Sequence, residues 1–322
     1  MNSVAALMPV ILLIACGWGV AKIGWVKKEH VASLANLVFL FLLPALLFRS
    51  MARVGFAGVD YYPIFIYLGV AEVIFLSVAF YLGRTPKSFV IGLSCIFSNH
   101  MMVGIPLIAI AYGEQALVTL ITLVSVHALV LLTFATVLLE WSIVREEQAK
   151  QGITGLSRSS IKSLLRVLGK TIYRAIVHPV ILPIAAGVLW SLTGWPLPEV
   201  IDKVLLMLGQ ANGALSLILV GIMLAFTKIN GELLRKSMVI SLIKTLIFPA
   251  LVFAACWFLG VRGLPLAVLT IGAGLPIGNN VYLFSMRNKL AEDLITASIA
   301  MSVLTSMVIL AVIMVMLGHW VL

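Results

Sequence analysis

Long apolar stretches separated by short polar segments run along almost the whole chain. A helix needs about 20 consecutive apolar residues to cross the hydrocarbon core of a bilayer. Charged residues and turn residues divide the pattern into ten windows of about this length. The predicted spans are residues 4–24, 32–51, 62–82, 88–111, 116–141, 176–193, 203–226, 236–259, 264–286 and 293–317. The pattern therefore predicts an all-α polytopic membrane protein with ten transmembrane helices.

The composition agrees with this class of protein. Hydrophobic residues make up 62% of the chain and charged residues 11%, and the mean hydropathy is +1.16. A soluble protein of 322 residues cannot hide so many apolar side chains below its surface. The first span has no Lys or Arg before it and is followed by Lys22, Lys27 and Lys28. A cleaved signal peptide has the opposite order, so we expect this span to be retained.

Several sequence landmarks recur at one constant offset of 170 residues. Agreement on one offset indicates a duplicated unit. We expect a first repeat in residues 1–141, a linker in residues 142–175 and a second repeat in residues 176–322. With five spans in each repeat, the second repeat must enter the membrane from the opposite side. The matched landmarks are Gly104-Ile105-Pro106 with Gly274-Leu275-Pro276, Gly17 with Gly187, Gly24-Trp25 with Gly194-Trp195, and Glu29 with Glu199.

The distribution of basic residues supports the same topology. Of the 22 Lys and Arg, 17 lie in the loops after odd-numbered spans and four in the loops after even-numbered spans. The positive-inside rule then places the odd loops in the cytoplasm and both termini outside. Seven of these cations lie in the central linker, which is either a solvated topology determinant or a contact for anionic lipid. Its stretch from Arg158 to Arg174 has the composition of a basic amphipathic helix. The net charge of +10 therefore needs no nucleic-acid partner.

The fourth and ninth spans each contain a Gly-x-Pro break. Proline lacks a backbone donor and disfavours helix in the preceding residue, while glycine permits unwound backbone. Such backbone is tolerated at membrane depth only when it is buried in protein or lines a wet cavity. If the two breaks cross, the N-termini of the half-helices face each other and favour an anion. The alternative is a pair of proline kinks used for helix packing.

Polar side chains crowd both breaks. Asparagine amides can donate to a carboxylate without bringing a net charge into the membrane, or they can satisfy freed backbone groups. His100 is either a satisfied core histidine or a proton carrier. The candidate substrate-binding residues are Asn99, His100, Gly104, Pro106, Pro276, Gly278, Asn279, Asn280 and Tyr282.

Two ionisable residues lie deep in predicted spans, Glu72 in the third and Lys244 in the eighth. The repeat offset carries Glu72 to a position two residues from Lys244, so the pseudo-symmetry predicts that the two side chains meet. An unpaired charge at the bilayer centre costs about 2.5–3.5 kcal/mol or more, so pairing or protonation is expected. The pair is either structural or a coupling and support site. We assign no role to His127 or His178.

These motifs resemble those of the auxin efflux carrier family in its short bacterial form, which is related in fold to the bile-acid sodium symporters. The resemblance covers nearly the whole chain. It rests on Leu43-Pro44-Ala45, Ser98-Asn99, Gly104-Ile105-Pro106, Leu275-Pro276 and Gly278-Asn279-Asn280-Val281-Tyr282. The chain departs from the family in having His100 beside the first crossover and in lacking the long central loop of plant members.

The resemblance implies a fold and a mechanism. Spans 1, 2, 6 and 7 would form a scaffold, and spans 3–5 and 8–10 a mobile transport part that contains the two crossovers. Asn99 and Asn279 would lie near the carboxylate-binding prolines, and Glu72 with Lys244 resembles an ion-site replacement on helices 3 and 8. Family members are secondary carriers of organic anions, and many bacterial relatives are labelled malonate or malate transporters.

We therefore expect a secondary transporter of a small carboxylate in a bacterial inner membrane, working by elevator-like alternating access. The alternative is an anion channel or membrane sensor with the same fold. The sequence has no nucleotide motif and no His, Asp or Cys cluster at catalytic spacing, so we expect neither an enzyme nor a cofactor or metal. The expected partners are the substrate, the lipid bilayer, protons through Glu72 or His100, and a second copy of the chain by fold analogy.

Overall fold

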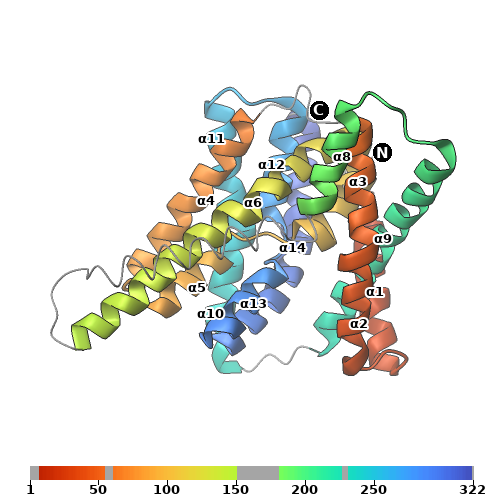
Figure 1. Ribbon diagram of the computed structural model, residues 1–322. Coiled ribbons are helices and arrows are strands. Elements are labelled where there is room, and N and C mark those ends of the chain that lie inside the picture. Colours follow the sequence, from red (N-terminus) through yellow and green to blue (C-terminus); the bar gives the residue numbers. More distant parts are fainter. Residues whose placement is uncertain (1–6, 55–60, 151–180, 227–230, 321–322) are drawn as a thin grey trace.

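The computed structural model describes residues 7–54, 61–150, 181–226 and 231–320, and nearly all of them are helical (Figure 1). These ranges contain no β-strand, which confirms the all-α class. The first elements are α1 (Leu7–Ile23), η1 (Lys28–His30), α2 (Val31–Leu37), η2 (Val38–Leu42), α3 (Leu43–Val54), α4 (Tyr62–Tyr81), α5 (Pro86–Ser94), η3 (His100–Gly104) and α6 (Ile105–Lys150). The later elements are α8 (Ile181–Leu192), α9 (Glu199–Phe226), α10 (Gly231–Leu242), η4 (Ile243–Ile247), α11 (Phe248–Phe258), α12 (Gly263–Gly274), α13 (Asn279–Asn288) and α14 (Glu292–Trp320).

Several of these helices have the length and composition of membrane spans. In the described part of the chain, six helical stretches are long and apolar enough to cross a bilayer, and three shorter apolar helices accompany them. The six stretches are Lys28–Arg53, Tyr62–Tyr81, His100–Ile143, Glu199–Phe226, Leu233–Phe258 and Glu292–Gly318. A helical membrane protein is therefore confirmed, and the count of ten spans stays a prediction.

The central linker lies largely outside the described residues, as residues 151–180 are not among them. The expected basic helix from Arg158 to Arg174, the start of the sixth span and His178 fall in the same gap. These expectations remain predictions from the sequence.

Helix α6 covers parts of two predicted spans. Its backbone is helical except at Gly113, where φ is 77° and ψ is −171°. A positive φ favours glycine because a side chain would be strained there. The position of Gly113 agrees with the predicted boundary between the spans 88–111 and 116–141.

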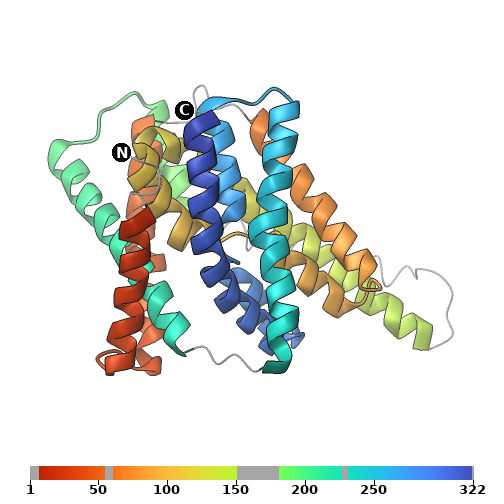
Figure 2. The ribbon, with the colours of Figure 1, turned by 180° about the vertical axis from the view of Figure 1, so that it is seen from behind.

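The helices pack in two groups (Figures 1 and 2). Helices α1, α3, α8 and α9 pack against one another, and α4, α5 and α10 to α14 form the second group, while α6 contacts both. One hydrophobic core lies wholly in the second group and α6, around Tyr67, Phe89 and Phe248. A second core, which includes Leu47 and Leu217, joins the first group to α6, α12 and α14. The two groups therefore meet across an apolar interface.

Two glycine pairs related by the 170-residue offset have matching surroundings. A Cβ atom at Gly17 would collide with a backbone carbonyl of α9, and one at Gly187 with a backbone carbonyl of α3. Small residues permit such close approach of membrane helices. Gly24 and Gly194 each follow a helix with positive φ, 87° and 69°. The offset thus relates positions with the same local function.

The two predicted helix breaks have different outcomes. At the second motif the helical structure is interrupted, since α12 ends at Gly274 and α13 starts at Asn279. The first prediction is wrong in its position. The chain leaves the helix at residues 95–99, and Gly104 and Pro106 lie in continuous helical structure. The π turn of η3 shifts the hydrogen-bond register, because the Gly104 amide donates to the Asn99 carbonyl five residues earlier. This local change lets the helix pass through Pro106, which has no N–H.

Candidate functional site

The two interrupted segments, residues 95–99 and 275–278, cross in the second group and bond to each other. The Asn99 amide donates to the Pro276 carbonyl at 2.8 Å, and the Gly278 amide donates to the Phe97 carbonyl at 2.9 Å. An antiparallel bridge joins Ser98 and Ile277 between them. The crossing therefore satisfies part of its own backbone, as non-helical chain at membrane depth requires.

Side chains of the surrounding helices satisfy other polar groups of the crossing. The Ile277 amide donates to Ser302 Oγ of α14 at 2.9 Å. The fully buried Lys244 Nζ of η4 donates to the carbonyls of Ala273 at 2.5 Å and Leu275 at 2.7 Å. The last carbonyls of a helix receive no hydrogen bond from an amide of the same helix, and the lysine amine supplies donors for them here.

Glycine is required where the two segments approach. A Cβ atom at Gly278 would lie 2.9 Å from Phe97 Cδ1 and 3.0 Å from the Ser98 carbonyl oxygen. A Cβ atom at Gly104 would lie 2.7 Å from Leu275 Cδ1. The two Gly-x-Pro motifs are therefore in contact, although only the second one interrupts a helix.

Two helices begin at this crossing. The run of η3 and α6 begins at His100, with Asn99 as its N-cap, and α13 begins at Asn279, with Gly278 as its N-cap. The first amides of a helix have no partner within the helix and carry partial positive charge. Two such ends at one place form a site that favours an anion without any cationic side chain.

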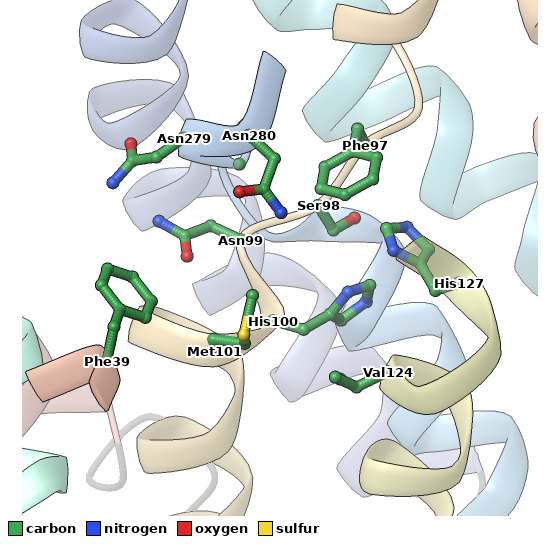
Figure 3. A pocket seen from close by; sticks show the side chains of 11 residues that line it. Phe39, Phe97, Ser98, Asn99, His100, Met101, Val124, His127, Asn279 and Asn280 are labelled. Carbon is green, nitrogen blue, oxygen red and sulfur yellow. The ribbon is translucent and has the colours of Figure 1, made fainter. Parts of the chain in front are cut away.

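A pocket opens beside these helix ends (Figure 3). Its empty space measures about 380 Å³, part of it open to solvent. None of its lining residues is Lys, Arg, Asp or Glu. The lining residues are Phe39 of η2, Phe97, Ser98 and Asn99 of the first crossing segment, His100 and Met101 of η3, Val124 and His127 of α6, and Gly278, Asn279 and Asn280.

The asparagines form one side of the pocket (Figure 3). Asn99 Oδ1 accepts a hydrogen bond from the Met102 amide at 3.2 Å and so caps the helix. This bond fixes the orientation of the amide, and its NH2 group makes no hydrogen bond to a described residue. Asn279 Nδ2 makes weak contacts with two sulfur atoms of described residues, Met102 Sδ at 3.3 Å and Met223 Sδ at 3.8 Å. Both amides therefore hold donors that a carboxylate can accept.

Ser98, His100 and His127 form the other side, and the Tyr67 hydroxyl contacts two of these side chains from outside the pocket lining. Tyr67 Oη lies 3.2 Å from Ser98 Oγ and 3.5 Å from His100 Nε2. The His100 and His127 rings are nearly perpendicular, with their centres 4.5 Å apart. All four side chains are buried. The histidines are therefore held in place by their neighbours.

The structure brings five of the predicted substrate-binding residues to the pocket and leaves four outside its lining. Asn99, His100, Gly278, Asn279 and Asn280 line it. The other four support the crossing or pack nearby: Gly104 contacts Leu275, Pro106 follows the π turn, Pro276 accepts from Asn99, and Tyr282 packs against the core of the second group.

Glu72 and Lys244 do not form the expected contact. Lys244 extends to the crossing, whereas both carboxylate oxygens of Glu72 are buried without a hydrogen-bond partner among the described residues. The expected pairing is wrong, because the carbonyls at the end of α12 occupy the lysine amine. A role of either residue in coupling stays a prediction.

Other pocket residues were missed from the sequence. Phe39, Met101 and Val124 are ordinary apolar residues of predicted spans, so nothing in the pattern distinguishes them. His127 was detectable, because an ionisable side chain inside a membrane span marks a functional position by default.

An ion-pair network centred on the buried Arg49 links two helices of the first group to α6, away from the pocket. Arg49 of α3 has a nearly inaccessible side chain, and its Nη1 donates to Glu114 Oε1 of α6 at 2.8 Å. Its Nη2 donates to Asp202 Oδ2 of α9 at 3.3 Å, and its Nε lies 2.9 Å from the other oxygen of that carboxylate. In the sequence, Arg49 is one of the four basic residues assigned to the loops after even-numbered spans, and nothing in the pattern predicts this network.

Comparison with known proteins connects the chain to membrane transport. A family model described as membrane transport protein matches residues 2–314. An uncharacterized transporter of Methanothermobacter thermautotrophicus is 24% identical over 318 residues, which cover 96% of each chain. Auxin efflux carrier component 8 of Arabidopsis thaliana is 20% identical over 242 residues, which cover 66% of each chain.

Proposed function

Because the chain belongs to the membrane transport protein family of the auxin efflux carriers, we propose that it is a secondary transporter of a small organic anion. Membership of this family was expected from the sequence motifs and is confirmed. The family consists of membrane transporters rather than enzymes. The proposed substrate is a carboxylate such as malonate or malate.

The observation that carries the proposal is the meeting of two helix N-termini beside a pocket lined by amides and imidazoles. Backbone amides at helix ends favour an anion, and neutral side-chain donors add hydrogen bonds to a carboxylate.

The proposed mechanism is elevator-like alternating access in a ten-helix protein with two inverted repeats, residues 1–141 and 176–322. Helices α1, α3, α8 and α9 would form the scaffold, and the second group with α6 would carry the crossing. This division is supported by the packing of the helices, which contact one another mainly within these two groups. The contact between the groups is largely apolar, which favours sliding, although Glu114 of α6 also pairs across it with Arg49 and Arg53 of α3.

The proposed setting is a bacterial inner membrane with both termini outside, and a homodimer formed through the scaffold. Proton coupling through Glu72 or His100 is a further part of the proposal, since both side chains are ionisable groups in predicted membrane spans. Counterflow at several pH values tests it. Equal pH profiles of the parent, Glu72→Gln and His100→Gln would exclude the coupling.

Counterflow into proteoliposomes tests the transport function. The purified protein is reconstituted with unlabelled malonate, malate or acetate inside, and uptake of the same labelled anion is followed. We expect saturable uptake that rises when internal substrate is present. The alternative, an anion channel with the same fold, predicts a non-saturating flux that internal substrate does not stimulate. Absence of uptake of every anion would refute the proposal.

A further inference from the structure

His127 contributes a polar group to the pocket that neither crossing segment supplies. It lies on α6, is only 2% exposed and lines the pocket. Its Nε2 atom is buried and has no hydrogen-bond partner among the described residues. Buried polar atoms are nearly always bonded, so this unbonded one needs an explanation, and a ligand in the adjoining pocket would supply the missing partner.

The neighbours of His127 hold its ring but do not engage this nitrogen. The ring packs at 4.5 Å from the Phe97 ring and stands nearly perpendicular to the His100 ring. His100 is in turn within 3.5 Å of the Tyr67 hydroxyl. Edge-to-face packing fixes the orientation of aromatic rings. The imidazole is therefore positioned before a ligand arrives, which reduces the entropy lost on binding.

The pocket consequently has two chemically different sides (Figure 3). The side chains of Asn99, Asn279 and Asn280 form one side, and those of Ser98, His100 and His127 form the other. A carboxylate at the helix ends leaves the rest of a small substrate directed toward the imidazoles. A neutral imidazole both donates and accepts, so it can bond a hydroxyl or a second carboxyl group.

We propose that His127 is a specificity-determining residue that binds a second polar group of the transported anion. This inference rests on the proposed transport function. It assigns the substrate class as short anions with a carboxylate at one end and a hydroxyl or carboxyl group near the other. Monocarboxylates with an apolar end gain nothing from His127.

Counterflow with substrates matched in length tests the inference. The pairs are malonate with propionate and succinate with butyrate, each measured for the parent, His127→Phe and His127→Gln. Phenylalanine keeps the ring and removes the hydrogen bond, whereas the glutamine amide reaches approximately to the position of Nε2. We expect His127→Phe to raise KM about tenfold for the two-ended anions, with the maximal rate and both monocarboxylates changed by less than about twofold. His127→Gln should restore most of the discrimination.

A matched control and a substitute variant complete the design. Thr122→Val is the control, because it also replaces a buried polar side chain of α6, but one that does not line the pocket. It removes the hydrogen bond that Thr122 Oγ1 donates to the Val118 carbonyl. Thr122→Val should leave the KM values of both members of each substrate pair unchanged. If His127→Phe is not inserted, His127→Asn takes its place, since its shorter amide cannot reach the Nε2 position.

The outcomes separate this inference from the transport function. Equal effects of His127→Phe on both members of a pair, or no effect on either, would overturn the role of His127 while the parent still shows counterflow. Absence of counterflow by the parent would remove the transport function itself. Selective loss of the two-ended substrates with rescue by glutamine is the expected result.

Discussion

Arg49 lies between two carboxylates that belong to different helices and differ in exposure. Its side chain is 5% exposed, that of Asp202 is 21% exposed and that of Glu114 is 60% exposed. Asp202→Asn keeps the shape of the side chain and an oxygen for Nη2, but it removes one of the two charges that balance the guanidinium. Glu114→Gln removes the other charge at a more solvated position.

The magnitudes follow from distance and burial. Opposite charges about 4 Å apart attract by about 4 kcal/mol at an effective dielectric constant of about 20. Removing one partner of a fully buried pair costs about 3–5 kcal/mol. Because Asp202 retains some exposure and Glu114 still pairs with Arg49, we expect Asp202→Asn to lower stability by about 2 kcal/mol. For the exposed Glu114, screening reduces the loss to below about 1 kcal/mol.

Thermal unfolding in detergent measures the difference. One kcal/mol shifts Tm by about 2–4 °C in chains of 150–250 residues, and this chain is longer. We therefore expect Tm to fall by about 4 °C for Asp202→Asn and by less than about 2 °C for Glu114→Gln. Glu199→Gln is the matched control, because Glu199 is 81% exposed and pairs with Lys203 on the same helix. Its Tm should equal that of the parent.

Two results would refute this reasoning. If Asp202→Asn had the same Tm as Glu199→Gln, the network would contribute no stability. If Glu114→Gln lowered Tm more than Asp202→Asn, burial would not determine the strength of the two pairs.

The other predictions concern the crossing. Gly278→Ala places a Cβ atom within 3.0 Å of Phe97 and Ser98, so counterflow should be lost or strongly reduced although the protein is expressed at the normal level. Gly69→Ala is the control, because nothing lies close to its Cβ, and it should transport like the parent. Normal counterflow of Gly278→Ala would contradict the close crossing. Lys244→Met leaves the carbonyls of Ala273, in α12, and Leu275, just after it, without their donor, and we expect the free energy of unfolding to fall by about 2 kcal/mol, seen as a lower Tm. Lys236→Met, at an exposed position of α10, is its control, and equal melting of the two variants would show that Lys244 does not support the crossing.

Much of the helical architecture could be predicted because it depends on local pattern. The predicted span 62–82 matches α4 (Tyr62–Tyr81), and the boundary between the fourth and fifth spans lies at Gly113. The interruption between α12 and α13 lies at the second Gly-x-Pro motif, where proline and glycine both oppose helix. The helix continues through Pro106, because the preceding π turn changes the hydrogen-bond register, and no propensity rule detects such a turn.

The site could be predicted only in part, because pockets are built from distant segments. Asn99 and Asn279 stood out as amides beside predicted breaks. Phe39 and His127 come from other helices and reach the pocket through tertiary packing alone. Lys244 was correctly identified as unusual, but its partners are backbone carbonyls, which have no sequence signature.

The most direct test of the anion site separates the two functions of Asn99. Asn99→Ser keeps an oxygen that caps the helix but removes the NH2 donor that faces the pocket. Loss of one hydrogen bond to a charged group costs about 1.5–3 kcal/mol, so KM for labelled malonate in counterflow should rise about tenfold or more. Pro106→Ala, outside the pocket lining, should change KM by less than about twofold. A parent-like KM of Asn99→Ser would contradict an anion site at the crossing.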